Sequence, residues 1–218
     1  MTQEKLNANY KKIVPIVGDT FSEAPLYVSL GMDSEYFELF DNVPQPEFQK
    51  SLEELALSKR TNWSVSGYLE DRSALLREFP EILAEKRVYH LGIDFNLPCG
   101  TTLNAPHDCE VVISEYEDGP GHYGGMVVLK TSTKEPFYML FGHLNPIALP
   151  DIGTKFKKGQ PFARIGDMSQ NGGWFYHTHF QILTQRGYDE GWASKGYCTE
   201  SALATIKDFC PDPFEFLD

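Results

Sequence analysis

The chain has 218 residues, of which 41% are hydrophobic and 13% aromatic, as is typical of a packed globular protein and not of a disordered one. Its 31 acidic and 19 basic residues give a net charge of −12, which argues against nucleic acid and anionic membranes as partners, because both repel an acidic chain. No stretch reaches the length of an apolar transmembrane helix.

The N-terminal sequence MTQEKLNANYKKIVPIVG has no long apolar run after its charged residues, so it does not have the pattern of a secretory signal. We therefore expect a cytoplasmic location. The composition does not indicate an oligomeric state. No two of the four cysteines form a CxxC pair, so we expect free thiols, some of them buried, at Cys99, Cys109, Cys198 and Cys210.

Residues 1–85 are expected to form a mostly helical N-terminal extension. The clearest helix covers residues 46–60, where Phe48, Leu52, Leu55 and Leu57 recur at helical intervals between charged residues. Residues 73–87 are consistent with a short helix interrupted at Pro80. We interpret the extension as a packing or partner-binding segment. The alternative, a segment that covers the active site, has no direct support in the sequence.

Residues 86–218 have the pattern of an antiparallel sheet or sandwich followed by an irregular C-terminal tail. Short apolar or alternating runs lie between glycine-containing turns. The predicted strands cover residues 109–116, 125–131, 137–144, 160–166 and 177–183. The segment KFKKGQPF resembles a hairpin with Gly159 in its turn. The fold class is therefore predicted to be mainly β, with a helical N-terminal extension.

The stretch GGWFYHTHFQI contains two histidines two residues apart. In a strand, His177, His179 and Gln181 would share one face, while the opposite face is largely apolar. A second cluster, HLGID, places His90 and Asp94 four residues apart with Gly92 between them, which leaves room for an ion. The preceding aromatic residues Trp174, Phe175 and Tyr176 either line a groove or pack in a core.

Two imidazoles and a carboxylate form a common ligand set for catalytic zinc, which keeps an open position for water. His90, Asp94 and His179 provide such a set, and His177 or His143 would handle protons beside it. Spacing alone leaves open which of the four histidines bind metal and which catalyse. His107 and His122 lie in turn-rich segments with no partner at metal spacing, so we interpret them as structural or surface residues.

Three segments in this order resemble the lysostaphin-type, or LytM-type, zinc metallopeptidases. They are HLGIDFNLPCGTTLNAPHDCEVV, FGHL at residues 141–144 and FKKGQPFARIGDMSQNGGWFYHTHFQI, and the resemblance covers roughly residues 88–184. It implies a β-sheet groove with Zn²⁺ on its floor, held by His90, Asp94 and His179. It also implies that His143 and His177 are catalytic residues that do not bind the metal. Members of this family usually cut peptide bonds in bacterial cell-wall cross-links, often beside glycine.

The flanking sequences, including NWSVSGYLEDR and CPDP, are most similar to a subgroup of these domains inside large intracellular proteins, fused to kinase-like and aminotransferase domains. We therefore expect a zinc-dependent metalloendopeptidase that acts on a peptide, such as a cell-wall peptide. Two alternatives remain. One is a regulatory module that binds peptide or protein without cleaving it, and the other is a zinc amidase for a small intracellular amide.

Overall fold

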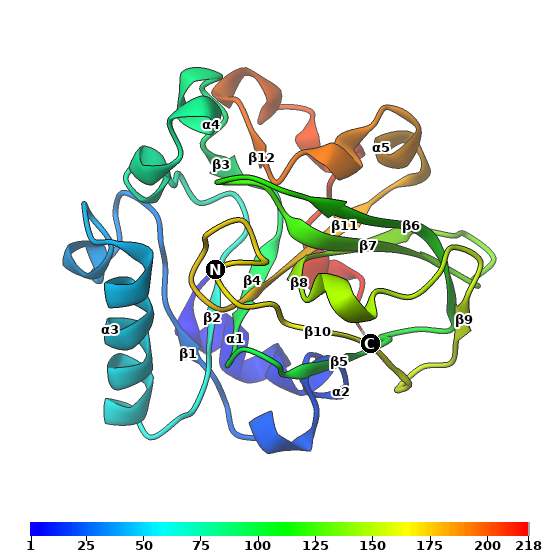
Figure 1. Ribbon diagram of the computed structural model, residues 1–218, viewed down its shortest axis with the longest axis horizontal. Coiled ribbons are helices and arrows are strands. Elements are labelled where there is room, and N and C mark those ends of the chain that lie inside the picture. The colour runs from blue at the N-terminus through cyan, green and yellow to red at the C-terminus, as the bar shows by residue number, and fades with distance from the viewer. Residues whose placement is uncertain (218) are drawn as a thin grey trace.

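Alternating apolar residues form the strands of one long sheet, which confirms the predicted mainly β class. The computed structural model describes residues 1–217 (Figure 1). Within this range the main sheet has the order β1-β2-β4-β11-β8-β7-β6-β9; β1 and β2 are parallel and the other neighbours antiparallel. Its strands are β1 (Leu26–Tyr27), β2 (Ser64–Ser66), β4 (Ile93–Asn96), β6 (Cys109–Glu117), β7 (Gly124–Thr131), β8 (Tyr138–Leu144), β9 (Lys155–Phe156) and β11 (Thr178–Leu183).

Two smaller pairs of strands flank this sheet. They are β5 (Thr102–Asn104) with β10 (Pro161–Arg164), and β3 (Tyr89–His90) with β12 (Tyr197–Cys198). The predicted hairpin in KFKKGQPF is wrong, because β9 pairs with β6 whereas β10 pairs with β5. The turn at Gly159 is present, with a positive φ of 83°, but it connects two different sheets.

The helices lie mainly in the N-terminal part of the chain and are short apart from α3. They are α1 (Gln3–Asn9), α2 (Val14–Val17), α3 (Gln45–Ser58), α4 (Pro80–Ala84) and α5 (Gln185–Asp189). In α3, Phe48 and Leu52 are buried as expected, but Leu57 is 68% exposed because it falls on the opposite side of the helix. Within residues 1–217, no helix has both the length and the apolar character needed to cross a membrane.

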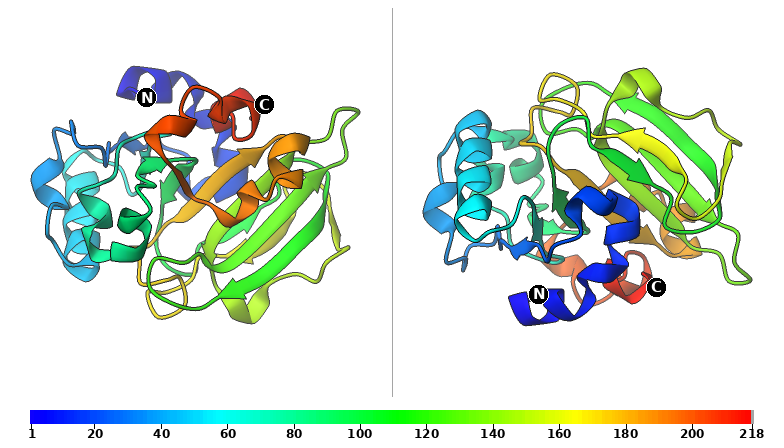
Figure 2. Two further views of the ribbon diagram at one scale, coloured as in Figure 1. Left: turned by 90° about the horizontal axis from the view of Figure 1, so that it is seen from above. Right: turned by 90° about the horizontal axis from the view of Figure 1, so that it is seen from below.

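The N-terminal segment contributes to the main sheet as well as to the helices. Strand β2 pairs with β4, opposing Ser66 to Asp94, and β1 extends the sheet beyond β2. Leu6 and Ile13 are fully buried in the same hydrophobic core as Phe180. Figure 2 shows α3 and α4 gathered at one end of the molecule, away from the long strands β6 and β7. The division at residue 85 stays a prediction, and the structure adds that residues before it complete the sheet.

The two faces of the sheet have different characters near β11. Phe180 and Ile182 point into the largest hydrophobic core together with Ile93 and Phe95 of β4. The residues between them, His179 and Gln181, point to the other face and are also buried. The period of two in the strand therefore separates an apolar core from a buried polar face, as the sequence pattern predicts.

Candidate metal centre and active site

Strand register brings the candidate ligands together. His179 of β11 lies directly opposite Asp94 of β4, so their side chains emerge side by side on the polar face. His90 ends β3, and its Nε2 lies 3.2 Å from Asp94 Oδ1 and 2.8 Å from His179 Nδ1. All three residues are buried, and one potential ligand atom from each lies within 4.8 Å of the others. The structure thus places the three predicted ligands in one cluster.

Gly92 provides the space between the two histidine segments. A Cβ atom at this position would lie 2.5 Å from the carbonyl oxygen of Phe180 and 2.7 Å from Cε1 of His179. Both distances are far below ordinary carbon contacts. A side chain at Gly92 would therefore displace His179 or its strand.

His143 reaches the site through an unusual backbone conformation. Its φ is +62°, a left-handed value that costs free energy in a residue other than glycine. Strict alternation along β8 would place His143 in the core beside Phe141, but the reversal places Leu144 there and turns His143 to the polar face. The His143 and His177 rings then lie with their centroids 4.3 Å apart. Such local strain is typical of functional positions.

Each candidate histidine is oriented through one ring nitrogen. Nδ1 of His90, His143 and His177 lies 2.8–2.9 Å from the backbone carbonyls of Gly67, Asn171 and Phe175, respectively. A carbonyl only accepts, so Nδ1 is the donor, and in the neutral ring Nε2 keeps its lone pair. Nε2 of His179 contacts Gln181 Oε1 at 2.9 Å, which leaves its Nδ1 for the cluster. This pattern orients a histidine for metal binding or proton transfer.

Asp94 has one oxygen engaged and one free. Oδ2 accepts a hydrogen bond of 2.6 Å from Arg72 Nη1. Oδ1 is buried without a hydrogen-bond partner among residues 1–217 and faces His90 and His179, 3.2 and 3.4 Å away. A buried carboxylate oxygen without a partner is costly. An oxygen so placed beside two imidazole nitrogens fits the ligand set of a zinc ion, which takes both donor types.

Arg72 is a site residue that the sequence reasoning missed. It is 1% exposed and also pairs with Glu70 Oε2, at 3.1 Å from Nε and 3.0 Å from Nη2. Glu70 Oε1 accepts hydrogen bonds from the Tyr27 hydroxyl and the Gly67 amide. The N-terminal segment therefore supplies the support for both His90 and Asp94. The only sequence signal was a charged triplet, Glu70–Asp71–Arg72, that ends a predominantly apolar run.

Burial keeps His90, His143 and His177 neutral, while neighbouring groups keep the Asp94 carboxylate ionised. Desolvation lowers the pKa of His90 and of His177 to about 4, and it lowers the pKa of His143 well below its usual range, with His177 and His179 adding to this effect. Burial alone would raise the pKa of Asp94, but His90 and the Arg72 guanidinium outweigh it and hold that pKa well below its usual range. Neutral imidazoles and a carboxylate are the forms that bind metal.

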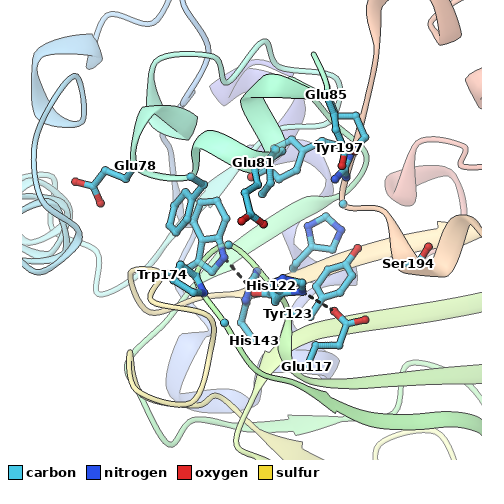
Figure 3. A pocket seen from close by; sticks show the side chains of 18 of the residues that line it. Glu78, Glu81, Glu85, Glu117, His122, Tyr123, His143, Trp174, Ser194 and Tyr197 are labelled. Atoms are coloured by element: carbon cyan, nitrogen blue, oxygen red, sulfur yellow. Dashed lines mark hydrogen bonds and ion pairs between the residues drawn. The ribbon is translucent and has the colours of Figure 1, made fainter.

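A cavity of about 790 Å³ opens onto this cluster (Figure 3). His143, His177 and His179 line it, together with the aromatic side chains of Phe79, Trp174 and Tyr197. His122 also lies on its wall, 3.9 Å from Glu117, which the sequence reasoning did not anticipate. His107 lies apart from the site and contacts the Phe216 carbonyl through Nε2 at 3.1 Å. Solvent and small substrates can therefore reach the histidines from one side.

The three aromatic residues before His177 have separate positions. Trp174 lines the cavity, while Phe175 packs in the core, 4.8 Å from the ring of Phe48 and 4.3 Å from the ring of His177. Tyr176 borders a second, much smaller hollow beside α3. Both predicted uses, groove lining and packing, thus occur within one short segment.

A family model matches the part of the chain that holds all five candidate metal and catalytic residues. Residues 88–190, just under half of the chain, match the model of peptidase family M23. No curated protein matches the chain.

Similar solved structures include LytU, at 26% identity over 44% of this chain and 62% of that one, with a TM-score of 0.38. A zinc-containing peptidase from Vibrio cholerae matches at 26% identity over 45% and 28% of the two chains, with a TM-score of 0.38. Lysostaphin from Staphylococcus simulans matches at 21% identity over 59% and 43%, with a TM-score of 0.42. The chain thus spans only part of these proteins. The match of residues 88–190 to the family model agrees with the predicted resemblance to lysostaphin-type peptidases.

Proposed function

We propose that the protein is a zinc-dependent metallopeptidase whose site joins the M23 domain to residues 67–72. The observation that carries this proposal is the unpartnered, buried Asp94 Oδ1 between His90 Nε2 and His179 Nδ1. We propose these three residues as the metal ligands. A bound zinc ion would supply a Lewis acid that polarises the substrate carbonyl and lowers the pKa of water to about 7.

His177 is the proposed general base. Its Nδ1 is engaged by the Phe175 carbonyl, and its Nε2 lies 3.8 Å from Asp94 Oδ1, on the cavity side of the cluster. The neutral ring therefore presents a lone pair where an attacking water would enter. Once protonated, the same nitrogen becomes a donor and can return the proton to the leaving amine.

His143 is the proposed partner of His177. Its ring lies beside that of His177, tilted by 51°, and is fixed through Nδ1 by the Asn171 carbonyl. Its Nε2 can share the proton that leaves water and, when protonated, donate a hydrogen bond to the oxyanion that develops on the carbonyl. The left-handed backbone at His143 is the structural feature that makes this role available.

The bond that we propose as substrate is a peptide amide, and the resemblance to lysostaphin-type enzymes favours glycine-containing peptides of the cell-wall type. The cavity volume of about 790 Å³ also lies within the range of small-molecule sites, which favours a small intracellular amide as the second candidate. The cytoplasmic location and the kinship with domains fused to kinase-like and aminotransferase domains stay predictions.

The test is cleavage by the zinc-loaded chain of a mass-resolved panel of glycine-containing peptides and small amides. The matched variant is His177→Ala, for which we expect zinc content equal to wild type and loss of cleavage. Zinc retained with full cleavage in His177→Ala would contradict the assignment of the base. Binding of a peptide without cleavage by the wild type would favour the regulatory-module alternative.

A further inference from the structure

One wall of the cavity comes from the N-terminal segment and is strongly acidic. The 3₁₀ turn Leu75–Glu78 and helix α4, with the residues that follow, contribute Glu78, Glu81 and Glu85. Glu117 at the end of β6 lies across the opening from Glu81, whereas the Glu78 carboxylate points away from the opening (Figure 3). Among the described residues that line the cavity, Arg87 is the one lysine or arginine, and its Nε pairs with Glu85 at 2.5 Å. The wall therefore has more negative than positive charge.

Two of these carboxylates have no cationic partner in the described chain. Within residues 1–217, neither Glu78 nor Glu81 takes part in an ion pair, and in Figure 3 the Glu81 carboxylate points toward the middle of the opening. Glu117 is within 3.9 Å of His122, which is charged only when protonated. A cavity walled by carboxylates concentrates cations and repels anions.

An independent feature deeper in the same cavity also indicates a ligand. Tyr123 lines the cavity, is only 7% exposed, and its hydroxyl has no hydrogen-bond partner among residues 1–217. Its ring lies 5.8 Å from that of His143 and 5.6 Å from that of His179. Burial raises the pKa of Tyr123 well above its usual value, so the hydroxyl keeps its proton and can donate it in a hydrogen bond. A substrate carbonyl beside the histidines would satisfy this donor.

Aromatic rings lie between the acidic wall and the histidines. Phe79 and Trp174 lie with their ring centroids 3.9 Å apart, and Tyr197 lies 6.4 Å from Trp174. All three rings are more than nine-tenths buried, so only their small exposed surface on the cavity can contact the aliphatic stem of a long cationic side chain. Carboxylates at the entrance and apolar ring surface below them are complementary to an ammonium or guanidinium group on a flexible chain.

We propose that the substrate carries a positive charge, on a lysine-type side chain or a free amino terminus, close to the bond that is cut. The charge lies against Glu81, while the adjoining carbonyl accepts a hydrogen bond from Tyr123. This specificity rests on the proposed peptidase function. It assigns a role to residues 75–87, all of which precede the family match, as the wall that selects the substrate.

The experiment uses the full zinc-loaded chain and fluorescent glycine-rich peptides of one length, with lysine, acetyllysine or glutamate at the same position and with blocked or free amino termini. Binding is measured by fluorescence anisotropy at low and high salt, and cleavage of the same peptides is followed by mass spectrometry. Glu81→Gln is the test variant. Glu115→Gln, an exposed residue of β6 outside the cavity, is the matched control.

We expect a charged peptide, either the lysine peptide or one with a free amino terminus, to bind about fivefold more tightly than its acetylated counterpart. This is the factor that about 1 kcal/mol from a partly exposed ion pair provides. The preference should fall in Glu81→Gln and at high salt, and persist in Glu115→Gln. Comparing the lysine peptide with the peptide that has a free amino terminus identifies which of the two charges the cavity recognises.

Equal binding of charged and acetylated peptides, tighter binding of the glutamate peptide, or no binding of any peptide would overturn the inference. Charge-selective binding without cleavage would support it while contradicting the proposed peptidase function. Cleavage without charge preference would support the peptidase function and contradict the charge preference. The two failures are therefore distinguishable.

Discussion

Removing the Arg72 guanidinium should destabilise the protein far more than removing an exposed one. Arg72 forms buried ion pairs with Asp94 at 2.6 Å and with Glu70 at 3.0 Å. Arg72→Met keeps an apolar stem but leaves both carboxylates buried without their cationic partner. Breaking a buried pair by removing one member typically costs about 3–5 kcal/mol. Because two carboxylates lose the same partner here, we expect the upper part of that range.

The matched control is Arg77→Met, which removes the guanidinium that pairs with Asp41 at the surface. The Arg77 side chain is 45% exposed, so water solvates both charges once the pair is broken. Exposed pairs contribute about 0–1 kcal/mol. The assay is urea unfolding of wild type and both variants with a chelator present, which separates the stability of the chain from metal binding.

Metal affinity provides a second measurement on the same variants. Arg72 fixes the Asp94 carboxylate so that Oδ1 faces the histidines. Loss of such support typically lowers metal affinity by about 10–100-fold. Arg72→Lys should fall between wild type and Arg72→Met, because a lysine supplies charge without the planar fork. A surface ion pair contributes about 1 kcal/mol at most. This reasoning would be refuted if the unfolding free energies of Arg72→Met and Arg77→Met agreed to within about that amount.

Three further predictions concern Gly92, His143 and the cysteines. Gly92→Ala should lose about 1–3 kcal/mol of stability and its zinc, because the added Cβ meets His179 and the Phe180 carbonyl; a melting temperature and zinc content equal to wild type would contradict this. His143→Asn, which tolerates the left-handed backbone, should keep its zinc yet lose about a hundredfold or more in kcat, and an unchanged kcat would remove His143 from the mechanism. In a thiol-labelling assay Cys99 should react rapidly in the native protein, and the other three thiols only after unfolding, because they are buried; rapid native labelling of all four would contradict the described packing.

The sequence predicted those parts of the site that depend on local periodicity. Alternation along residues 177–183 correctly separates His179 and Gln181 from Phe180 and Ile182, because the period of a strand fixes which face each side chain takes. The order of the motifs also predicted the match of residues 88–190 to the M23 family model. The zinc ligands and the catalytic histidines stay predictions, which the geometry supports by bringing all five side chains to one place.

Features that depend on contacts between distant segments were not predictable in this way. Arg72 meets Asp94 only because β2 pairs with β4, and no spacing within the sequence encodes that pairing. His143 points to the site through a left-handed backbone, which reverses the alternation that the sequence pattern implies. The hairpin predicted at Gly159 is wrong because its two strands pair with strands of different sheets.

The zinc site at His90, Asp94 and His179 is tested most directly by the zinc content of the native protein, measured by mass spectrometry beside His90→Ala and Asp94→Asn. His107→Ala is the control, since that ring contacts the Phe216 carbonyl away from the cluster. We expect about one zinc per chain in wild type and His107→Ala, as for a single three-ligand catalytic site, and loss of zinc in the two ligand variants. A wild-type chain that fails to retain zinc after it is offered, or ligand variants that retain it in full, would contradict the assignment of this metal site.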